Sequence, residues 1–377
     1  MADDLRGGLV GPAANPAVEL GARGAPAAEA EPRPPLGVAL ELDLARPDAL
    51  LSLALLNGLS AQTRARRIAL SVTRPSLVAA QLADVIAEYY ATLPANWGYA
   101  TIGMVEDGMP RGGSPSPEPQ LAALLARKNL DGAPLYPTRV HRLVDTADSA
   151  TLLRNLLLAE QDGNTAIVLA GAATGLSHLL DLYGAPAQLR AKVKVLVVAA
   201  PEAAIASDPR AARRVFADWP TPIVAVGAEF GEAVRFPAKV VQELLATAPE
   251  HPVAAAYAAL GRMPYDAPTT ALAGVLAAVS YGVSSGVQPE GEEYRLSEPG
   301  SISVQEDGRT RFTPRAAGMH RYWIANPAKA QSLLAQYTAL VSAPPVPRPV
   351  IKRKPMPPAL AAGAQQPAEP PAAAKPR

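Results

Sequence analysis

Short, continuous apolar runs alternate along this chain with longer stretches in which apolar residues recur at helical spacing. Runs such as 165–171 and 193–199 predict strands that are covered on both faces. The alternation is typical of an α/β fold, a mostly parallel open sheet with helices on both faces. The strands predicted in this way are 37–43, 67–73, 99–105, 165–171, 193–199 and 222–227, and the helices between them are 76–92, 148–160 and 208–217.

The pattern changes after residue 236, where helical spacing dominates. A small C-terminal β-hairpin is then predicted, with arms at 301–304 and 310–313 and with Asp307-Gly308 as its turn. The helices predicted in this part of the chain are 236–247, 252–261, 268–279 and 327–341.

Both ends of the chain differ in composition from the middle. Residues 1–36 and 343–377 are rich in Ala and Pro, with Gly frequent in the first segment, and neither shows a sustained period. Such segments bury too little apolar surface to fold, so we expect both to be disordered. The remaining residues, 37–342, form the predicted folded domain.

Composition excludes several classes of function. The net charge is +1, which gives no sign of a nucleic-acid-binding surface. The chain has no cysteine, so disulfides, thiolate catalysis and zinc–thiolate sites are all excluded. No apolar run reaches the roughly 18 residues that a membrane span needs. The start, Met1-Ala2-Asp3-Asp4, is acidic and lacks an apolar signal core, which predicts a cytoplasmic protein but leaves export open.

The most informative local feature is a pair of carboxylates, Asp43 and Asp48, at the end of the first predicted strand. Ligands of open α/β sheets bind at the carboxyl ends of the strands. Two carboxylates there can hold a hard cation such as Ca²⁺, which prefers oxygen ligands. Alternatively, Asp48 begins or caps a helix and Asp43 is only a polar strand end.

Further polar residues follow other predicted strands or precede helices. Glu202 follows strand 193–199, and Thr174 follows strand 165–171. Asp208-Pro209 is typical of a helix start, with Asp at the cap and Pro at the first position. Capping is also the alternative role for Thr174 and for Asp266. Glycine-rich nucleotide loops and the Gly-x-Ser-x-Gly elbow are missing, which counts against nucleotide-cofactor enzymes and α/β-hydrolases.

An ordered series of short motifs resembles the nucleoside hydrolase family (inosine/uridine-preferring), in particular a divergent bacterial branch. The family opens with Asp-Thr-Asp-x-x-x-Asp-Asp-Ala, and this chain has Glu-Leu-Asp-Leu-Ala-Arg-Pro-Asp-Ala at 41–49. The family turn Gly-x-x-Thr-Asn-Leu corresponds to Gly-Ala-Ala-Thr-Gly-Leu at 171–176. A Glu-x-Asn segment and an Asp-Pro-x-Ala-Ala helix start correspond to 202–204 and 208–212.

The resemblance implies a metal-dependent hydrolase of N-glycosidic bonds in nucleosides or related ribosyl compounds. Its Ca²⁺ would be held by Asp43, Asp48, the backbone carbonyl of Thr174, and Asp266. Asp43 would be the general base that activates water, and the transition state would resemble an oxocarbenium ion. Glu202 would bind the ribose, and Ser76 would occupy the place of a substrate-binding Asn. The implied partner is a small-molecule substrate, and family members are commonly homo-oligomers.

Several positions depart from the family pattern. Glu41, Pro47, Gly175 and Ala204 replace an Asp, an Asp, an Asn and an Asn, so the metal ligands are kept while much of the sugar-binding shell is lost. Each lost hydrogen bond to a sugar hydroxyl costs about 0.5–1.5 kcal/mol. A second hypothesis is therefore a catalytically impaired relative that serves as a binding or structural module. A third is an unrelated α/β binding protein, in which these aspartates do not cluster and no metal binds.

Overall fold

The computed structural model describes residues 34–91, 101–105, 118–283 and 293–346. All of them except Pro34 belong to one compact unit that begins at Pro35. The predicted disorder of 1–36 and 343–377 falls almost entirely outside the described residues and stays a prediction.

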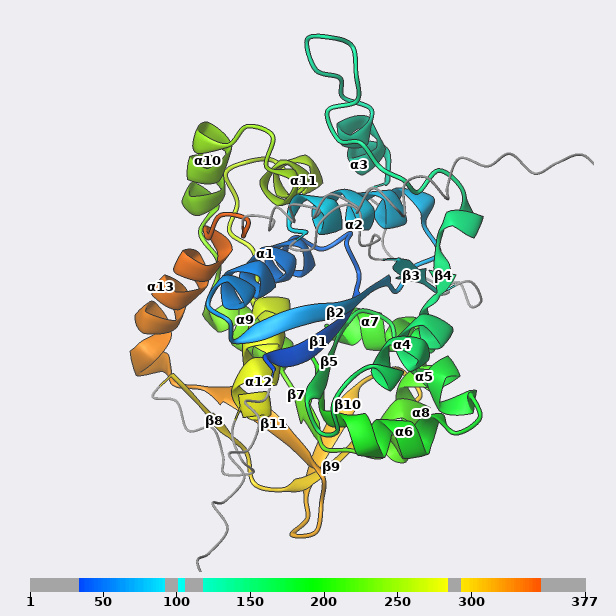
Figure 1. Ribbon diagram of the computed structural model, residues 1–377. Coiled ribbons are helices and arrows are strands. Elements are labelled where there is room, and N and C mark those ends of the chain that lie inside the picture. Colours follow the sequence, from blue (N-terminus) through cyan, green and yellow to red (C-terminus); the bar gives the residue numbers. More distant parts are fainter. Residues whose placement is uncertain (1–33, 92–100, 106–117, 284–292, 347–377) are drawn as a thin grey trace, which may run out of the picture. The chain divides into compact units, whose positions relative to one another are not determined.

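The strands form one mixed sheet, whose order is β10-β9-β11-β7-β6-β5-β1-β2-β3-β4, with β8 paired to β11 (Figure 1). Pairing is parallel from β11 through β7 to β4, and antiparallel where β8, β9 and β10 join. The strands are β1 Leu36–Leu42, β2 Ala65–Val72, β3 Ile102–Met104, β4 Ala147–Asp148, β5 Thr165–Ala170, β6 Val193–Val198, β7 Ile223–Ala225, β8 Tyr294–Leu296, β9 Gly300–Val304, β10 Thr310–Pro314 and β11 His320–Ala325. This architecture confirms the predicted fold class, including the C-terminal hairpin.

The strand order contains a switch point. From β1 the chain moves to one side through β2, β3 and β4, and it then returns to the other side of β1 with β5, β6 and β7. β1 is thus hydrogen-bonded to β2 on one side and to β5 on the other, and both pairs are parallel. A crevice opens at the carboxyl ends of two such strands because their following loops diverge.

Helices cover both faces of this sheet (Figure 1). One face carries the larger core, built by helices that include α1, α11 and α12, and the other carries a core built mainly by α4, α5, α6 and α8. The helices are α1 Pro47–Ala61, α2 Leu77–Tyr89, α3 Glu118–Leu125, α4 Ser149–Leu158, α5 Thr174–Asp181, α6 Ala185–Lys192, α7 Glu202–Ser207, α8 Pro209–Asp218, α9 Ala228–Ala233, α10 Ala238–Thr247, α11 Pro252–Leu260, α12 Thr270–Val283 and α13 Ala330–Val341, with 3₁₀ turns at Leu143–Asp145 and Pro327–Lys329.

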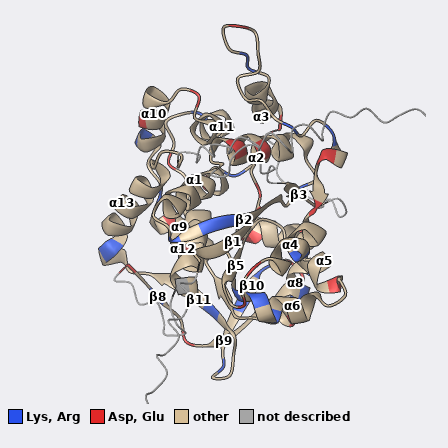
Figure 2. Cartoon of the chain, viewed as in Figure 1, with Lys and Arg blue, Asp and Glu red and all other residues tan. Residues whose placement is uncertain are grey.

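Charged residues of both signs are scattered over the described elements (Figure 2). None of the described helices is both long enough and apolar enough to cross a membrane. Two arginines near the start of β2 are tied to the fold by their side chains: Arg66 pairs with Glu160, and Arg67 donates to the carbonyl of Ala87 at 3.2 Å. These contacts lie at the amino end of β2, away from the switch point.

The close approach of α1 to α13 depends on a glycine. A Cβ atom at Gly58 would overlap the backbone carbonyl of Leu340 in α13. Because backbone cannot rotate aside as a side chain can, the two helices would have to separate. Gly58 therefore fixes their packing distance.

We predict that Gly58→Ala lowers the free energy of unfolding by about 1–3 kcal/mol, despite the better helix propensity of alanine. Urea unfolding followed by circular dichroism measures this loss. Ala61→Ser, at the exposed end of the same helix, is the control and should change stability by less than about 0.5 kcal/mol. A Gly58→Ala protein as stable as the control would refute the packing constraint.

Candidate functional site

The switch point lies where β1 and β5 end side by side. The backbone N–H of Asp43 donates to the carbonyl of Ala170 at 3.3 Å, which ties the end of β1 to the end of β5. Residues 43–48, here called the aspartate loop, comprise the connection from β1 and the first two residues of α1, while residues 171–173 connect β5 to α5. The structure therefore places the first and second motifs of the sequence at one edge of the sheet, as predicted.

Asp48 is buried, with 1% of its surface exposed, and its carboxylate is shared by two donors. Arg46 binds its Oδ2 atom at 2.6 Å, and the backbone N–H of Ala271 binds the same atom at 3.0 Å. Ala271 is the second residue of α12, so Asp48 caps that helix rather than its own. Burial raises the pKa of Asp48, and the Arg46 cation and the Ala271 N–H oppose this rise.

Asp43 is also buried and also pairs with an arginine. Arg74, which follows β2, brings its Nε atom to 2.9 Å from Oδ2 of Asp43. The other carboxylate oxygen, Oδ1, accepts the backbone N–H of Ala45 at 3.2 Å. Both oxygens of the predicted general base are therefore engaged within the protein.

The remaining predicted site residues serve the ends of helices. Asp266 is exposed and accepts the N–H of Ala238 at the start of α10, at 2.8 Å. Ser76 is the N-cap of α2 and accepts the N–H of Ala79 at 3.1 Å. The hydroxyl of Thr174 donates to Asp208 at 2.7 Å, and Asp208 caps α8 as the sequence predicted.

These residues do not fit a calcium ion as they are arranged. Across the ranges described, no group of three or more His, Cys, Asp or Glu side chains is placed to hold a metal. Asp43 and Asp48 share a loop, but each binds an arginine, and Asp266 caps a different helix. Ca²⁺ needs six to eight oxygen ligands around one point, which this geometry does not offer. Calcium binding and the role of Asp43 as a base stay predictions.

A buried polar cluster lies beside the aspartate loop. It consists of Glu41, Ser71, Thr73 and Ser149, and within the described part of the chain one side-chain oxygen of each lacks a hydrogen-bond partner. Glu41 and Ser71 are neighbours across the β1–β2 ladder. Burial raises the pKa of Glu41 to about 7, the nearby Ser71 hydroxyl opposes this rise, and the charge of Asp148 adds to it. Glu41 is thus a carboxyl group that titrates near neutral pH.

Two departures from the family pattern meet in this cluster. A Cβ atom at Gly175 would lie 2.7 Å from Oγ of Ser149 and 3.4 Å from Oε2 of Glu41. Glu41 is one methylene longer than the Asp of the family motif, and Gly175 lacks the side chain of the family Asn. The longer carboxyl group therefore lies next to position 175, where a side chain would first meet Ser149.

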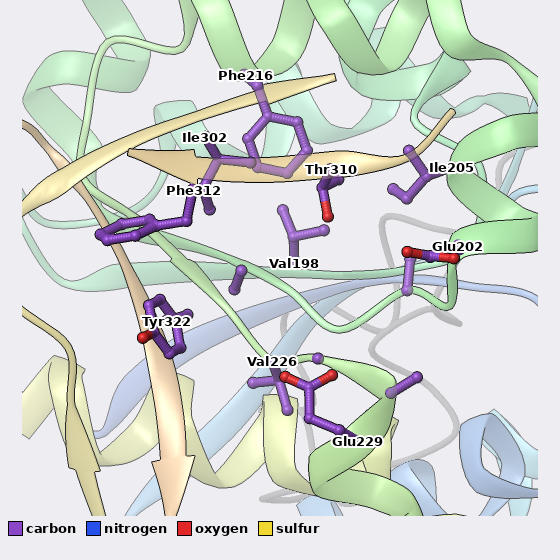
Figure 3. A pocket seen from close by; sticks show the side chains of 14 residues that line it. Val198, Glu202, Ile205, Phe216, Val226, Glu229, Ile302, Thr310, Phe312 and Tyr322 are labelled. Carbon is purple, nitrogen blue, oxygen red and sulfur yellow. The ribbon is translucent and has the colours of Figure 1, made fainter. Parts of the chain in front are cut away.

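A cavity of about 400 Å³ opens at the same edge of the sheet, beyond the ends of β6 and β7. We call it the Glu202 cavity. Glu202 from α7 and Glu229 from α9 line it, and in Figure 3 the carboxylate of Glu229 points into it. The hairpin covers it, because Gly308 in the β9–β10 turn packs directly on Ala206 of α7. The full lining is Val198, Ala200, Glu202, Ile205, Phe216, Ala225, Val226, Gly227, Ala228, Glu229, Ile302, Thr310, Phe312 and Tyr322.

The walls of the Glu202 cavity combine aromatic and acidic groups. Phe312 and Tyr322 meet edge to face with ring centroids 4.9 Å apart, and Phe216 lies on another wall. Neither Glu202 nor Glu229 forms an ion pair with any described residue, and both are exposed. The cavity is large enough for a small organic ligand. Of the predicted site residues only Glu202 lines it, whereas Asp43, Asp48 and Asp266 do not.

Sequence reasoning missed Arg46, Arg74, Glu229 and Phe312. Arg74 follows β2, and Glu229 follows β7, so the shared carboxyl edge of parallel strands could have indicated both. The place of Phe312 in the cavity wall could not be found in this way, because the sequence does not show which elements the hairpin packs against. One histidine outside these sites, His251, is the N-cap of α11. It is buried and bonded to Tyr90 at 3.0 Å, and burial lowers its pKa to about 4.

Comparison with known structures gives the class of the fold. An inosine-uridine preferring nucleoside hydrolase from Bacillus anthracis superposes with a TM-score of 0.56 and 17% identity, over 81% of this chain and 99% of that one. An inosine-guanosine nucleoside hydrolase gives 0.59 and 13%, over 81% and 98%. The type III effector XopQ, in complex with adenosine diphosphate ribose, gives 0.55 and 14%, over 84% and 94%.

Sequence comparison alone finds much less. No family model matches the chain, and no curated protein matches it. The structural matches nevertheless span nearly the whole length of each neighbour. The chain therefore has the nucleoside hydrolase fold, which confirms the resemblance inferred from its motifs.

We predict that Glu41→Gln stabilises the protein at alkaline pH. The pKa of Glu41 rises from 4.5 to about 7 on folding. The contribution of the protonated side chain to the free energy of unfolding is therefore fully present below pH 4.5 and is lost as pH rises through 7. Glutamine carries no charge to bury, so the difference between variant and wild type should reach about 1–3 kcal/mol above pH 8 and vanish near pH 4. Chemical denaturation at pH 4, 6 and 8 measures it. A difference that does not vary with pH would contradict the raised pKa.

Proposed function

We propose that this protein binds a nucleoside or a related ribosyl compound in the Glu202 cavity, as a nucleoside-hydrolase-like module that lacks calcium-dependent turnover. The observation that carries this proposal is the cavity itself, at the carboxyl edge of a nucleoside hydrolase fold, with a predicted ribose-binding carboxylate on its wall. Two structural neighbours are nucleoside hydrolases, and another is in complex with adenosine diphosphate ribose.

The chemistry of the lining supports a nucleoside. Carboxylates accept hydrogen bonds from adjacent sugar hydroxyls, and Glu202 and Glu229 are free to do so. Phe216, Phe312 and Tyr322 offer aromatic surface against which a base can stack. No Lys or Arg is among the lining residues, so phosphate groups would meet only negative charge. The lining therefore favours an uncharged nucleoside over a nucleotide.

The same geometry argues against efficient hydrolysis. Asp43 lies at the end of β1, two strands from the β6 end of the cavity, and Arg74 binds its carboxylate. A general base must reach the proton that it removes, and both oxygens of Asp43 are already hydrogen-bonded within the protein. Glu202 and Glu229, which are exposed, remain for binding.

A second candidate is the metal-dependent N-glycoside hydrolase that the sequence predicted. The observation in its favour is that Asp43 and Asp48 are buried on one loop at the switch point. In this case Ca²⁺ would displace Arg46 and Arg74, and Asp43 would act as the base. The two candidates differ in whether turnover depends on calcium.

Calorimetric titration with adenosine, inosine and uridine tests the first candidate. We expect micromolar to millimolar binding of at least one, and weaker binding of adenosine diphosphate ribose than of adenosine. Glu202→Gln and Phe312→Ala should each weaken binding about tenfold or more, since a charge-assisted hydrogen bond or a stacked base is worth about 1–3 kcal/mol. Glu306→Gln, an exposed hairpin position outside the cavity, is the control. Equal affinities in all three variants would place the ligand elsewhere.

Ribose release from the same nucleosides, with millimolar Ca²⁺ or with chelator, distinguishes the second candidate. We expect no release that calcium stimulates, because the aspartate loop is already neutralised by arginine. Calcium-stimulated release that Asp43→Ala abolishes would establish the hydrolase instead. Release that survives Asp43→Ala would exclude Asp43 as the base.

A further inference from the structure

We propose that Arg46 and Arg74 are built-in counter-cations, which neutralise the aspartate loop in place of a divalent ion and make this fold independent of calcium. The inference concerns the switch-point loop alone and does not depend on which ligand enters the Glu202 cavity. It follows from the positions of the two guanidinium groups, from their charge, and from the sequence around them.

Arg46 lies inside the aspartate loop and holds it to the sheet. Its Nη2 atom pairs with Asp48 at 2.6 Å, while its Nη1 atom donates to the carbonyl of Ala170, the last residue of β5, at 3.3 Å. Only 18% of its side chain is exposed. One guanidinium thus links α1, the loop and the end of β5 at the switch point.

Arg74 approaches the same loop from the other neighbouring strand. It follows β2, and its Nε atom lies 2.9 Å from Oδ2 of Asp43. Arg46 therefore joins the loop to β5, and Arg74 joins it to β2, the two strands that flank β1. The two cations bind both sides of the switch point.

The charges balance without any ion. Asp43 and Asp48 carry two negative charges, and Arg46 and Arg74 carry two positive charges, which equals the charge of one divalent cation. Arginine stays protonated at every pH that proteins tolerate, so this neutralisation is permanent. A divalent cation entering here would have to displace both arginines or be repelled by them.

The sequence of the loop agrees with the replacement of a divalent cation by arginine. In the family motif the residue before the last aspartate is also an aspartate, whereas here it is Pro47, so the loop has one carboxylate fewer. The residue before Pro47 is Arg46 itself. A proline at the first position of α1 fixes the backbone there, which holds Arg46 in the extended conformation that directs it to Asp48.

Thermal unfolding with and without Ca²⁺ tests the proposal. The wild-type melting temperature should differ by less than about 1 °C between millimolar Ca²⁺ and chelator. Arg46→Met/Arg74→Met leaves two buried carboxylates unpaired, so it should melt lower and recover by about 3 °C or more when Ca²⁺ is added. Arg46→Lys/Arg74→Lys keeps the charges and should show no response to Ca²⁺.

Arg142→Met/Arg214→Met is the matched control, because these arginines pair outside the aspartate loop, with the half-buried Asp145 and the exposed Asp181. It should not respond to Ca²⁺. If the double Met variant does not fold, Arg46→Met alone and calorimetric titration of the wild type with Ca²⁺ decide the matter. Calcium binding to the wild type, or Met variants that ignore Ca²⁺, would overturn the proposal, whatever the outcome of nucleoside binding.

Discussion

The structure depends on how two buried negative charges are neutralised where β1 ends. Moving a carboxylate out of water costs several kcal/mol unless a partner compensates it. Asp43 and Asp48 lie at the centre of the sheet, between β2 and β5, and the chain supplies two arginines to compensate them. These pairs tie the flanking strands to the loop, and Asp48 also caps α12 from a distance of 223 residues in sequence. One electrostatic constraint therefore positions the loop, two strands and a helix that packs behind them.

Most of the sheet could be predicted from sequence, because its central strands are continuous apolar runs. β5 and β6 are the clearest examples. The strand β11 was missed because it contains Arg, Tyr and Trp in place of such a run, and it is recognised only by its pairing with β7, β8 and β9. The site could be predicted only in part. Spacing gave the carboxylates at strand ends, but it could not show that each aspartate binds an arginine or caps a distant helix, since those partners are fixed by tertiary contacts.

The polar interior near the switch point shows how a sequence can keep a fold while changing its chemistry. Glu41 and Gly175 are adjacent in space, although 134 residues separate them in sequence. A side chain at position 175 would first meet the Ser149 hydroxyl, so glycine leaves room beside Ser149 and Glu41. The result is a carboxyl group that titrates near neutral pH beside the Ser71 and Ser149 hydroxyls. The carboxyl group of Glu41 thus carries less charge, and the carboxylates of Asp43 and Asp48 are paired with arginines of the same chain. A site for a free cation requires the opposite, namely charged carboxylates that are not already paired.

The two outer strands of the sheet have a further consequence, which concerns self-association. An open sheet ends in unpaired N–H and C=O groups, and these can recruit the edge of another molecule. At one end, β4 is only two residues long. At the other, β10 exposes four of its five residues, among them Arg311 and a closing Pro314 that has no N–H to offer. Within the described chain both of these edges are thus poor templates for strand addition.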